Sequence, residues 1–115
     1  MPSSSTVTSH FAKSAASVRT TYDTLLTAAR AFGPVHEEPK KTSIHLVRTS
    51  AFAGVATRKH GLVLTLKSTK RVASPRVRRA EQASANRWHL EIPLASPDDV
   101  DAELRRWLRD AYELA

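Results

Sequence analysis

The sequence predicts an α+β domain, a two-layer sandwich whose antiparallel four- to five-stranded sheet carries the N- and C-terminal helices on one face. Apolar residues recur at helical spacing near both ends of the chain and alternate with polar residues through its middle. Short turns separate most of the alternating segments, and strands joined by short turns pair antiparallel. The 115 residues suit one domain, in which two amphipathic helices cover one sheet face.

The N-terminal segment, residues 1–14, is rich in Ser and Thr and has no usable period. We expect a disordered tail there with an anchor at Phe11, followed by a single domain over residues 15–115. Gly33 and Pro34 end the first helix, since glycine supplies a left-handed stop and proline prevents continuation. That helix is predicted from one apolar stripe: Ala15, Val18, Tyr22, Leu25, Leu26, Ala29 and Phe32.

Four strands are predicted next, over residues 35–38, 43–48, 51–57 and 62–67. The first ends at Pro39, so we expect it at an edge of the sheet. A four-residue connection ending in glycine joins the last two strands, which is typical of a hairpin.

Alternation also predicts which side chains face the core. In the third strand we expect Phe52, Gly54 and Ala56 to face the helices, and Ala53 and Val55 to face outward. The outer face of the sheet would then carry mostly small or polar side chains.

Residues 68–86 combine weak periodicity with many charges, and we expect a short turn of helix near residues 77–83. The clearest strand follows over residues 87–94, where Trp88 is in phase with Leu90 and is predicted to lie in the core.

The last helix begins with a capping sequence in which Ser96 is the N-cap and Pro97 and Asp99 occupy the first and third helical positions. Tyr112 is the ring that we expect to be exposed. The apolar stripe of this helix consists of Val100, Leu104, Trp107, Leu108 and Ala111.

Five segments together resemble the bacterial domain family DUF5655, a domain of unknown function. They are Pro39–Val47, Ala51–Val55, Leu62–Leu66, Asn86–His89 and Ser96–Leu104, and the resemblance extends over about residues 18–114. It implies a small stand-alone or fused α+β module. The family has no settled activity to carry over to these residues.

The charge of +7 is unevenly distributed: residues 40–90 contain twelve Lys or Arg and one acid, Glu81, whereas residues 91–115 carry a net charge of −4. Such a basic stretch favours a polyanion partner such as nucleic acid, bound through its phosphates. The alternative is that the acidic last helix neutralises it. The candidate polyanion-binding residues are Lys40, Lys41, Arg58, Lys59, Lys67, Lys70, Arg71, Arg76, Arg78 and Arg79.

The outer sheet face offers a second candidate, a polar pocket for a small anionic ligand. Its residues would be Thr42, Ser43, His45, His89 and Glu91. Two imidazoles and a carboxylate can also ligate a metal, but isolated surface histidines are the usual explanation, and we expect no metal and no cofactor.

Several enzyme classes are excluded by what the sequence lacks. There is no cysteine, no Gly-rich phosphate loop, no His-Glu-x-x-His and no Gly-x-Ser-x-Gly. Neither a membrane-spanning run nor a leader peptide is visible, so we expect a cytoplasmic protein. The favoured function is a non-catalytic binding or accessory module with a basic surface, and the alternative is a small-ligand-binding domain. The oligomeric state is left open.

Overall fold

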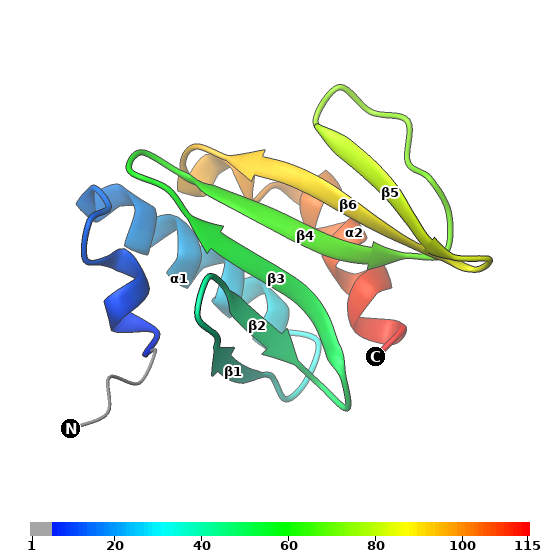
Figure 1. Ribbon diagram of the computed structural model, residues 1–115, viewed down its shortest axis with the longest axis horizontal. Coiled ribbons are helices and arrows are strands. Elements are labelled where there is room, and N and C mark those ends of the chain that lie inside the picture. Colours follow the sequence, from blue (N-terminus) through cyan, green and yellow to red (C-terminus); the bar gives the residue numbers. More distant parts are fainter. Residues whose placement is uncertain (1–5) are drawn as a thin grey trace.

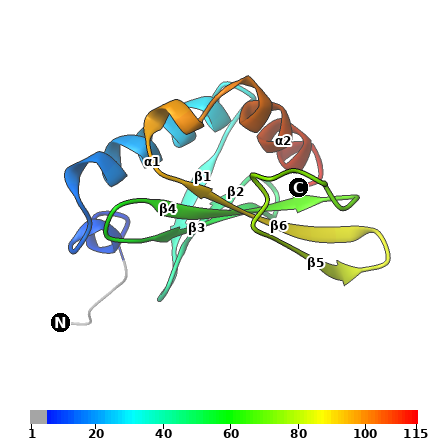
Figure 2. The same cartoon turned by 90° about the horizontal axis from the view of Figure 1, so that it is seen from above.

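The computed structural model describes residues 6–115 and contains one antiparallel sheet packed against two α-helices (Figure 1). Both α-helices lie on the same face of the sheet, as Figure 2 shows, which confirms the predicted fold class. Within the described residues the strand order is β1-β2-β3-β4-β6-β5, so the sheet has six strands where four to five were predicted. The elements in chain order are η1 (Thr8–Phe11), α1 (Ala16–Arg30), β1 (His36–Pro39), β2 (Ile44–Val47), β3 (Ala51–Thr57), β4 (Leu62–Ser68), β5 (Arg79–Ser84), β6 (Arg87–Leu94), η2 (Pro97–Asp99) and α2 (Ala102–Glu113).

The core lies between the helices and the inner face of the sheet. A row of paired residues crosses the four central strands there, from Ile44 through Val55 and Leu64 to Ile92, and all four are fully buried. The apolar stripe of α1 packs over this row, as its spacing predicted.

The facing predicted for β3 is wrong at most positions, because β3 contains a bulge. Leu46 of β2 pairs with Ala53, whereas the next residue of β2 pairs with Ala51, so Phe52 is an extra residue. The bulge lets Phe52 and Ala53 both be buried. It also moves Gly54 to the outer face, where it pairs with His45.

The helical turn predicted near residues 77–83 is also wrong, since this segment contains β5. Its residues have weak strand propensity, but β6 would otherwise present a free edge, and Arg79 to Gln82 pair with Glu91 to Trp88. Tertiary pairing, which a local pattern does not report, therefore decides the structure of this segment.

The C-terminal helix begins later than its capping sequence suggests. Ser96 and Asp99 frame the short 3-10 turn η2, where the Asp99 carboxylate accepts hydrogen bonds from the amides of Ala95 and Ser96. Asp101 is the N-cap of α2, and its carboxylate accepts the amide of Leu104 at 3.0 Å.

Tyr112 is buried, at 4% exposure, contrary to the exposed ring that was predicted. Its ring lies edge-on to Phe52, with 5.2 Å between centroids, and the Arg48 guanidinium lies 4.6 Å from its centroid. Trp88 and Trp107 are only partly buried and pack against the core, whereas Trp88 was predicted to lie within it.

Residues 6–14 are not a free tail, although residues 1–5 of that predicted segment lie outside the described part of the chain. The η1 turn packs Phe11 on Tyr22 with 5.2 Å between ring centroids, which places the anchor where it was expected. The amide of Ala15 also donates to the carbonyl of Lys59 at 2.7 Å. Within residues 6–115 no helix is both long enough and apolar enough to cross a membrane.

Candidate functional site

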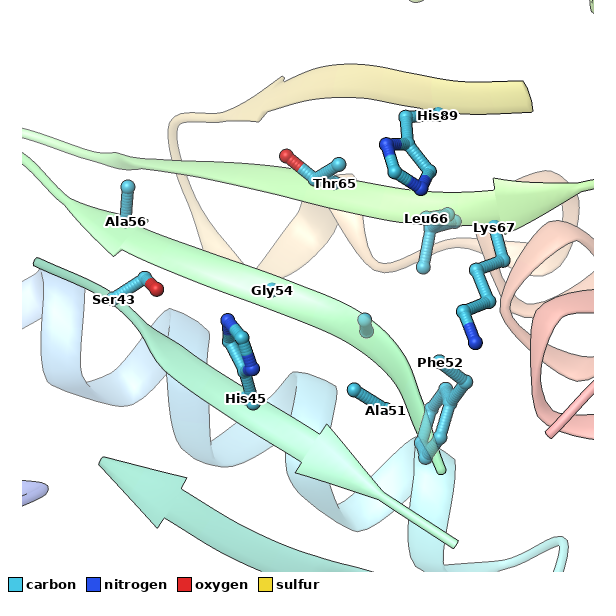
Figure 3. A pocket seen from close by; sticks show the side chains of 11 residues that line it. Ser43, His45, Ala51, Phe52, Gly54, Ala56, Thr65, Leu66, Lys67 and His89 are labelled. Atoms are coloured by element: carbon cyan, nitrogen blue, oxygen red, sulfur yellow. The ribbon is translucent and has the colours of Figure 1, made fainter. Parts of the chain in front are cut away.

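The outer face of the sheet contains a hollow of about 330 Å³ that no helix within residues 6–115 covers (Figures 2 and 3). Strands β2, β3, β4 and β6 each contribute side chains to it. The lining residues are Ser43, His45, Ala51, Phe52, Ala53, Gly54, Ala56, Thr65, Leu66, Lys67 and His89.

The floor of this hollow is open because the central strand carries small residues. Gly54 lies between His45 and Thr65 in the same cross-strand row, and Ala56 lies two residues along. A Cβ at Gly54 would meet only the His45 ring, whose Cδ2 atom would lie 3.8 Å away. Glycine is thus not required for steric reasons here, and its effect is to leave flat backbone exposed at the centre.

The rim of the hollow consists of polar side chains that can donate hydrogen bonds. Figure 3 shows His45 at one side and His89 at the other, with Thr65 between them, and Lys67 lies beside His89 as its cross-strand partner. The Lys67 Nζ atom donates to the Ser50 hydroxyl at 3.4 Å, a weak contact that leaves the ammonium group able to bind an anion.

The two histidines lie too far apart to share a metal ion. They belong to β2 and β6, which are separated by three strand spacings, or about 14 Å. In the described part of the chain no three His, Cys, Asp or Glu side chains form a cluster that could hold a metal. The two imidazoles therefore do not form a shared metal site within the described residues.

Two residues of the predicted ligand pocket do not line this hollow. The Glu91 carboxylate binds Arg78, with 2.9 Å between Oε1 and Nη2. Thr42 lies in the turn before β2 and lines a separate hollow beside η1. Of the five predicted residues, the structure thus brings Ser43, His45 and His89 to one site.

The ten predicted polyanion-binding residues do not form one surface. Lys41, Arg58 and Lys59 line the hollow beside η1, and Lys40 nearby is paired with Glu38 at 2.9 Å. Lys67 lies at the other end of β4, about 20 Å away by the rise of a strand. It lines a third hollow with Lys70, Arg71 and α2 residues.

The three remaining arginines of that set are engaged in ion pairs. The Arg76 guanidinium contacts Asp101 at 2.8 Å and Glu103 at 3.2 Å, and it donates to the carbonyl of Asp99. Arg78 and Arg79 pair with acids of the sheet, Glu91 and Glu81. The acidic start of α2 therefore neutralises Arg76, which the sequence analysis held open as the alternative to polyanion binding.

Two carboxylates in these ion pairs, those of Asp101 and Glu38, have a lowered pKa. The amide of Leu104 and the Arg76 guanidinium together hold the pKa of Asp101 below its usual range. A hydrogen bond and the charge of Lys40 lower the pKa of Glu38 in the same direction. Both carboxylates therefore remain ionised in mild acid and keep their cations occupied.

Alternation in the fourth strand placed Thr65 on the outer face, but the predicted ligand pocket did not include it. The prediction also left out the small residues of the floor, Ala51 and Ala56. It also missed Lys13, which lies in the predicted tail yet lines the hollow beside η1. Because the facing of β3 was predicted wrongly, Gly54 and Ala56 were assigned to the core, and the floor of the hollow was not recognised. A glycine in the middle of an otherwise regular strand was the available signal for it.

Comparison with known proteins identifies a family but no characterised relative. The family model described as Domain of unknown function (DUF5655) matches residues 7–115. Neither a curated protein nor a solved structure gives a match. The matched region includes η1, so the family domain begins before the boundary at residue 15 that the sequence predicted.

Proposed function

The chain belongs to the DUF5655 family, and we propose that it is a non-catalytic binding module that takes a small organic anion on the open face of its sheet. The observation that carries this proposal is the hollow over Gly54, which combines a flat apolar floor with a donor-rich rim. Small-molecule sites typically have this combination of a largely apolar lining and a few convergent polar groups.

The charge of the rim selects the class of ligand. Lys67 supplies a permanent positive charge, and the ring nitrogens of His45 and His89 and the hydroxyls of Ser43 and Thr65 can donate hydrogen bonds. Within residues 6–115 no Asp or Glu lines the hollow. The carboxylates that flank it across the strands are each paired with a cation: Glu38 beside His45, Glu91 beside Thr65 and Glu81 beside His89. An anion is favoured there because the lining includes the positive charge of Lys67 and no carboxylate.

The shape of the floor selects the body of the ligand. Ala51, Gly54 and Ala56 present a surface without projecting side chains, on which a planar ring can lie. We infer an aryl carboxylate, with its ring over Gly54 and its carboxylate toward Lys67. A hydrogen bond to a charged group contributes roughly 1.5–3 kcal/mol, so the charged end should dominate the affinity.

A binding role is favoured over catalysis by the surroundings of the histidines. In residues 6–115 neither His45 nor His89 hydrogen-bonds to a serine, a threonine or a carboxylate. A nucleophile and its base would stand within hydrogen-bond reach of each other.

The proposal is tested by titrating ¹⁵N-labelled protein with 2-naphthoate and, separately, with the uncharged 2-naphthamide. We expect naphthoate to shift the amide signals of lining residues on β2, β3, β4 and β6, and naphthamide to bind at least fivefold more weakly. Equal binding of the two compounds, or shifts confined to another surface, would refute the proposal.

Two variants of the floor sharpen this test. Gly54→Leu fills the hollow and should abolish the naphthoate shifts, whereas Gly54→Ala adds one methyl in ordinary van der Waals contact with the His45 ring and should retain most of them. Gly54→Ala should also raise stability by about 0.5–1 kcal/mol, because glycine is entropically unfavourable in a strand. If the face instead binds a second copy of the chain, sedimentation will show a dimer that Gly54→Leu dissociates, and the small-ligand proposal fails.

Lys67 has a matched control in Lys70, which lies three residues along and outside the hollow. Lys67→Gln should weaken naphthoate binding at least fivefold, whereas Lys70→Gln should leave it within twofold. Equal effects of the two substitutions would show that the net charge, rather than the rim, determines binding.

A further inference from the structure

Figure 1 shows the end of the sheet where the β3–β4 hairpin turns. A second hollow, of about 630 Å³, is lined by residues of this turn. Three segments that are distant in sequence meet there: η1 with the residues after it, the β1–β2 turn and the β3–β4 turn. Its lining residues are Ser9, His10, Ala12, Lys13, Ser14, Lys41, Thr42, Thr57, Arg58 and Lys59.

Hydrogen bonds to the backbone hold these segments together. The His10 ring binds the carbonyl of Lys40 at 2.8 Å, and the Ser14 hydroxyl donates to the carbonyl of Arg58 at 2.8 Å. The amide of Ala15 donates to the carbonyl of Lys59 at 2.7 Å. The residues that bear the cations are therefore tied in place by contacts that do not use the cations themselves.

Four cationic side chains line this hollow: Lys13, Lys41, Arg58 and Lys59, here called the hairpin-end cluster. All four are exposed, and within residues 6–115 none of them forms an ion pair. Among the described residues, no acid lines the hollow. Four like charges gathered in this way repel one another, and an anion bound among them removes that repulsion.

The hairpin-end cluster differs in this respect from the basic stretch between β4 and β6. There Arg76, Arg78 and Arg79 each contact a carboxylate, so their charge is already compensated. Lys70 and Arg71 of that stretch form no ion pair within residues 6–115, but the hollow that they line also contains the acids Asp110 and Glu113. The hairpin-end hollow instead combines four cations with no lining acid among the described residues, and Lys13 there joins residues from the middle of the sequence.

We propose that the hairpin-end cluster binds the phosphate groups of a nucleic-acid backbone. The hollow is wider than one phosphate, and its cations come from three separate turns, so it suits a chain of phosphates rather than a single ion. Serine and threonine hydroxyls among the cations can add hydrogen bonds to phosphate oxygens. In the part of the chain that the structure describes, His10 supplies the one aromatic ring in the lining, so the contacts follow the backbone and read no base sequence.

The salt dependence of binding follows from the number of cations. If each of the four contacts one phosphate of duplex DNA, the logarithm of the binding constant falls with the logarithm of salt concentration with a slope of about −3.6. On single-stranded DNA the same four contacts give a slope of about −2.8.

The test is fluorescence anisotropy of a labelled 20-base-pair duplex across a potassium chloride series, starting at low salt. One variant replaces the hairpin-end cluster by Lys13→Gln, Lys41→Gln, Arg58→Gln and Lys59→Gln. The matched control replaces four exposed cations elsewhere, by Lys70→Gln, Arg71→Gln, Arg105→Gln and Arg106→Gln, and so changes the net charge equally. Circular dichroism and thermal melting establish that both variants remain folded.

We expect the cluster variant to lose at least tenfold in affinity and to reduce the salt slope to near zero, while the control stays within threefold of the original protein. Equal losses in the two variants, or no binding of the original protein at low salt, would overturn the proposal. Displacement of the duplex by micromolar inorganic triphosphate would assign the site to small polyphosphates instead and would likewise overturn it.

This inference and the proposed function fail independently. The cluster variant leaves every residue around Gly54 unchanged, so its naphthoate titration should match that of the original protein. Gly54→Leu should in turn leave duplex binding unchanged.

Discussion

Gly33, which follows α1, has a φ of +151°, a conformation that residues with a Cβ rarely adopt. A Cβ built there would collide with the hydroxyl of Tyr112, which donates a hydrogen bond to the carbonyl of Pro34 at 3.0 Å. Gly33→Ala therefore introduces backbone strain of about 1–3 kcal/mol and breaks a hydrogen bond that contributes about 1 kcal/mol. We expect a loss of about 2–4 kcal/mol in the free energy of unfolding.

The assay is urea unfolding followed by tryptophan fluorescence, with Tyr112→Phe and the double variant measured beside Gly33→Ala. Tyr112→Phe alone should cost about 1 kcal/mol, since it removes the hydroxyl but keeps the buried ring. Because it also removes the atom that the new methyl would strike, the double variant should lose about 1 kcal/mol less than the two single losses combined. If Gly33→Ala lies within 0.5 kcal/mol of the original protein, or the two losses are additive, the reasoning is wrong.

Three further predictions concern ion pairs and the N-terminal segment. Arg76→Gln should lower the free energy of unfolding by about 1–2 kcal/mol, because its side chain, 25% exposed, connects the β4–β5 segment to α2. Arg78→Gln is the control: that side chain is 55% exposed, and the substitution should change stability by less than about 0.5 kcal/mol. Urea unfolding midpoints measure both. The pKa of Asp101 is lower in the folded protein than its ordinary value of 3.8, so ionised Asp101 stabilises the fold at any pH above 3.8. This contribution is lost as the pH falls through the folded-state pKa. The Asp101→Asn variant should therefore lose less stability between pH 5 and pH 2 than the original protein. Phe11→Ala should free the segment around Lys13, so trypsin should cleave there faster. Gly54→Ala, a substitution on the outer face of the sheet, should leave that cleavage rate unchanged.

The predictions that held are those in which local pattern and burial agree. The stripe of α1 spans most of the helix, and the alternation of residues 87–94 is long enough to define β6 without tertiary information. The bounds of β3 were also predicted correctly, although its facing was not. Alternation identifies a strand, but one extra residue reverses which side chains are buried after it.

The candidate site was only partly predictable for the same reason. Ser43, His45 and His89 were chosen from alternation in β2 and β6, where no bulge intervenes before them, and all three line the hollow. Its floor was assigned to the core, because Phe52 was used to set the phase of β3. The position of Lys13 depends on contacts between η1 and two turns, which no periodicity records.

The sequence by itself determined the class of the fold, both helices, most of the strands and the excess of positive charge, since these depend on composition and on short-range periodicity. Only the tertiary structure decided which cations remain unpaired, because Arg76 meets Asp101 across 25 positions of sequence whereas Lys13, Lys41 and Arg58 meet no acid in the described residues. It likewise decided that Gly54 opens onto solvent, through a bulge that exists only when β2 and β3 pair. Pairing between distant segments creates both candidate sites, and local sequence does not encode that pairing.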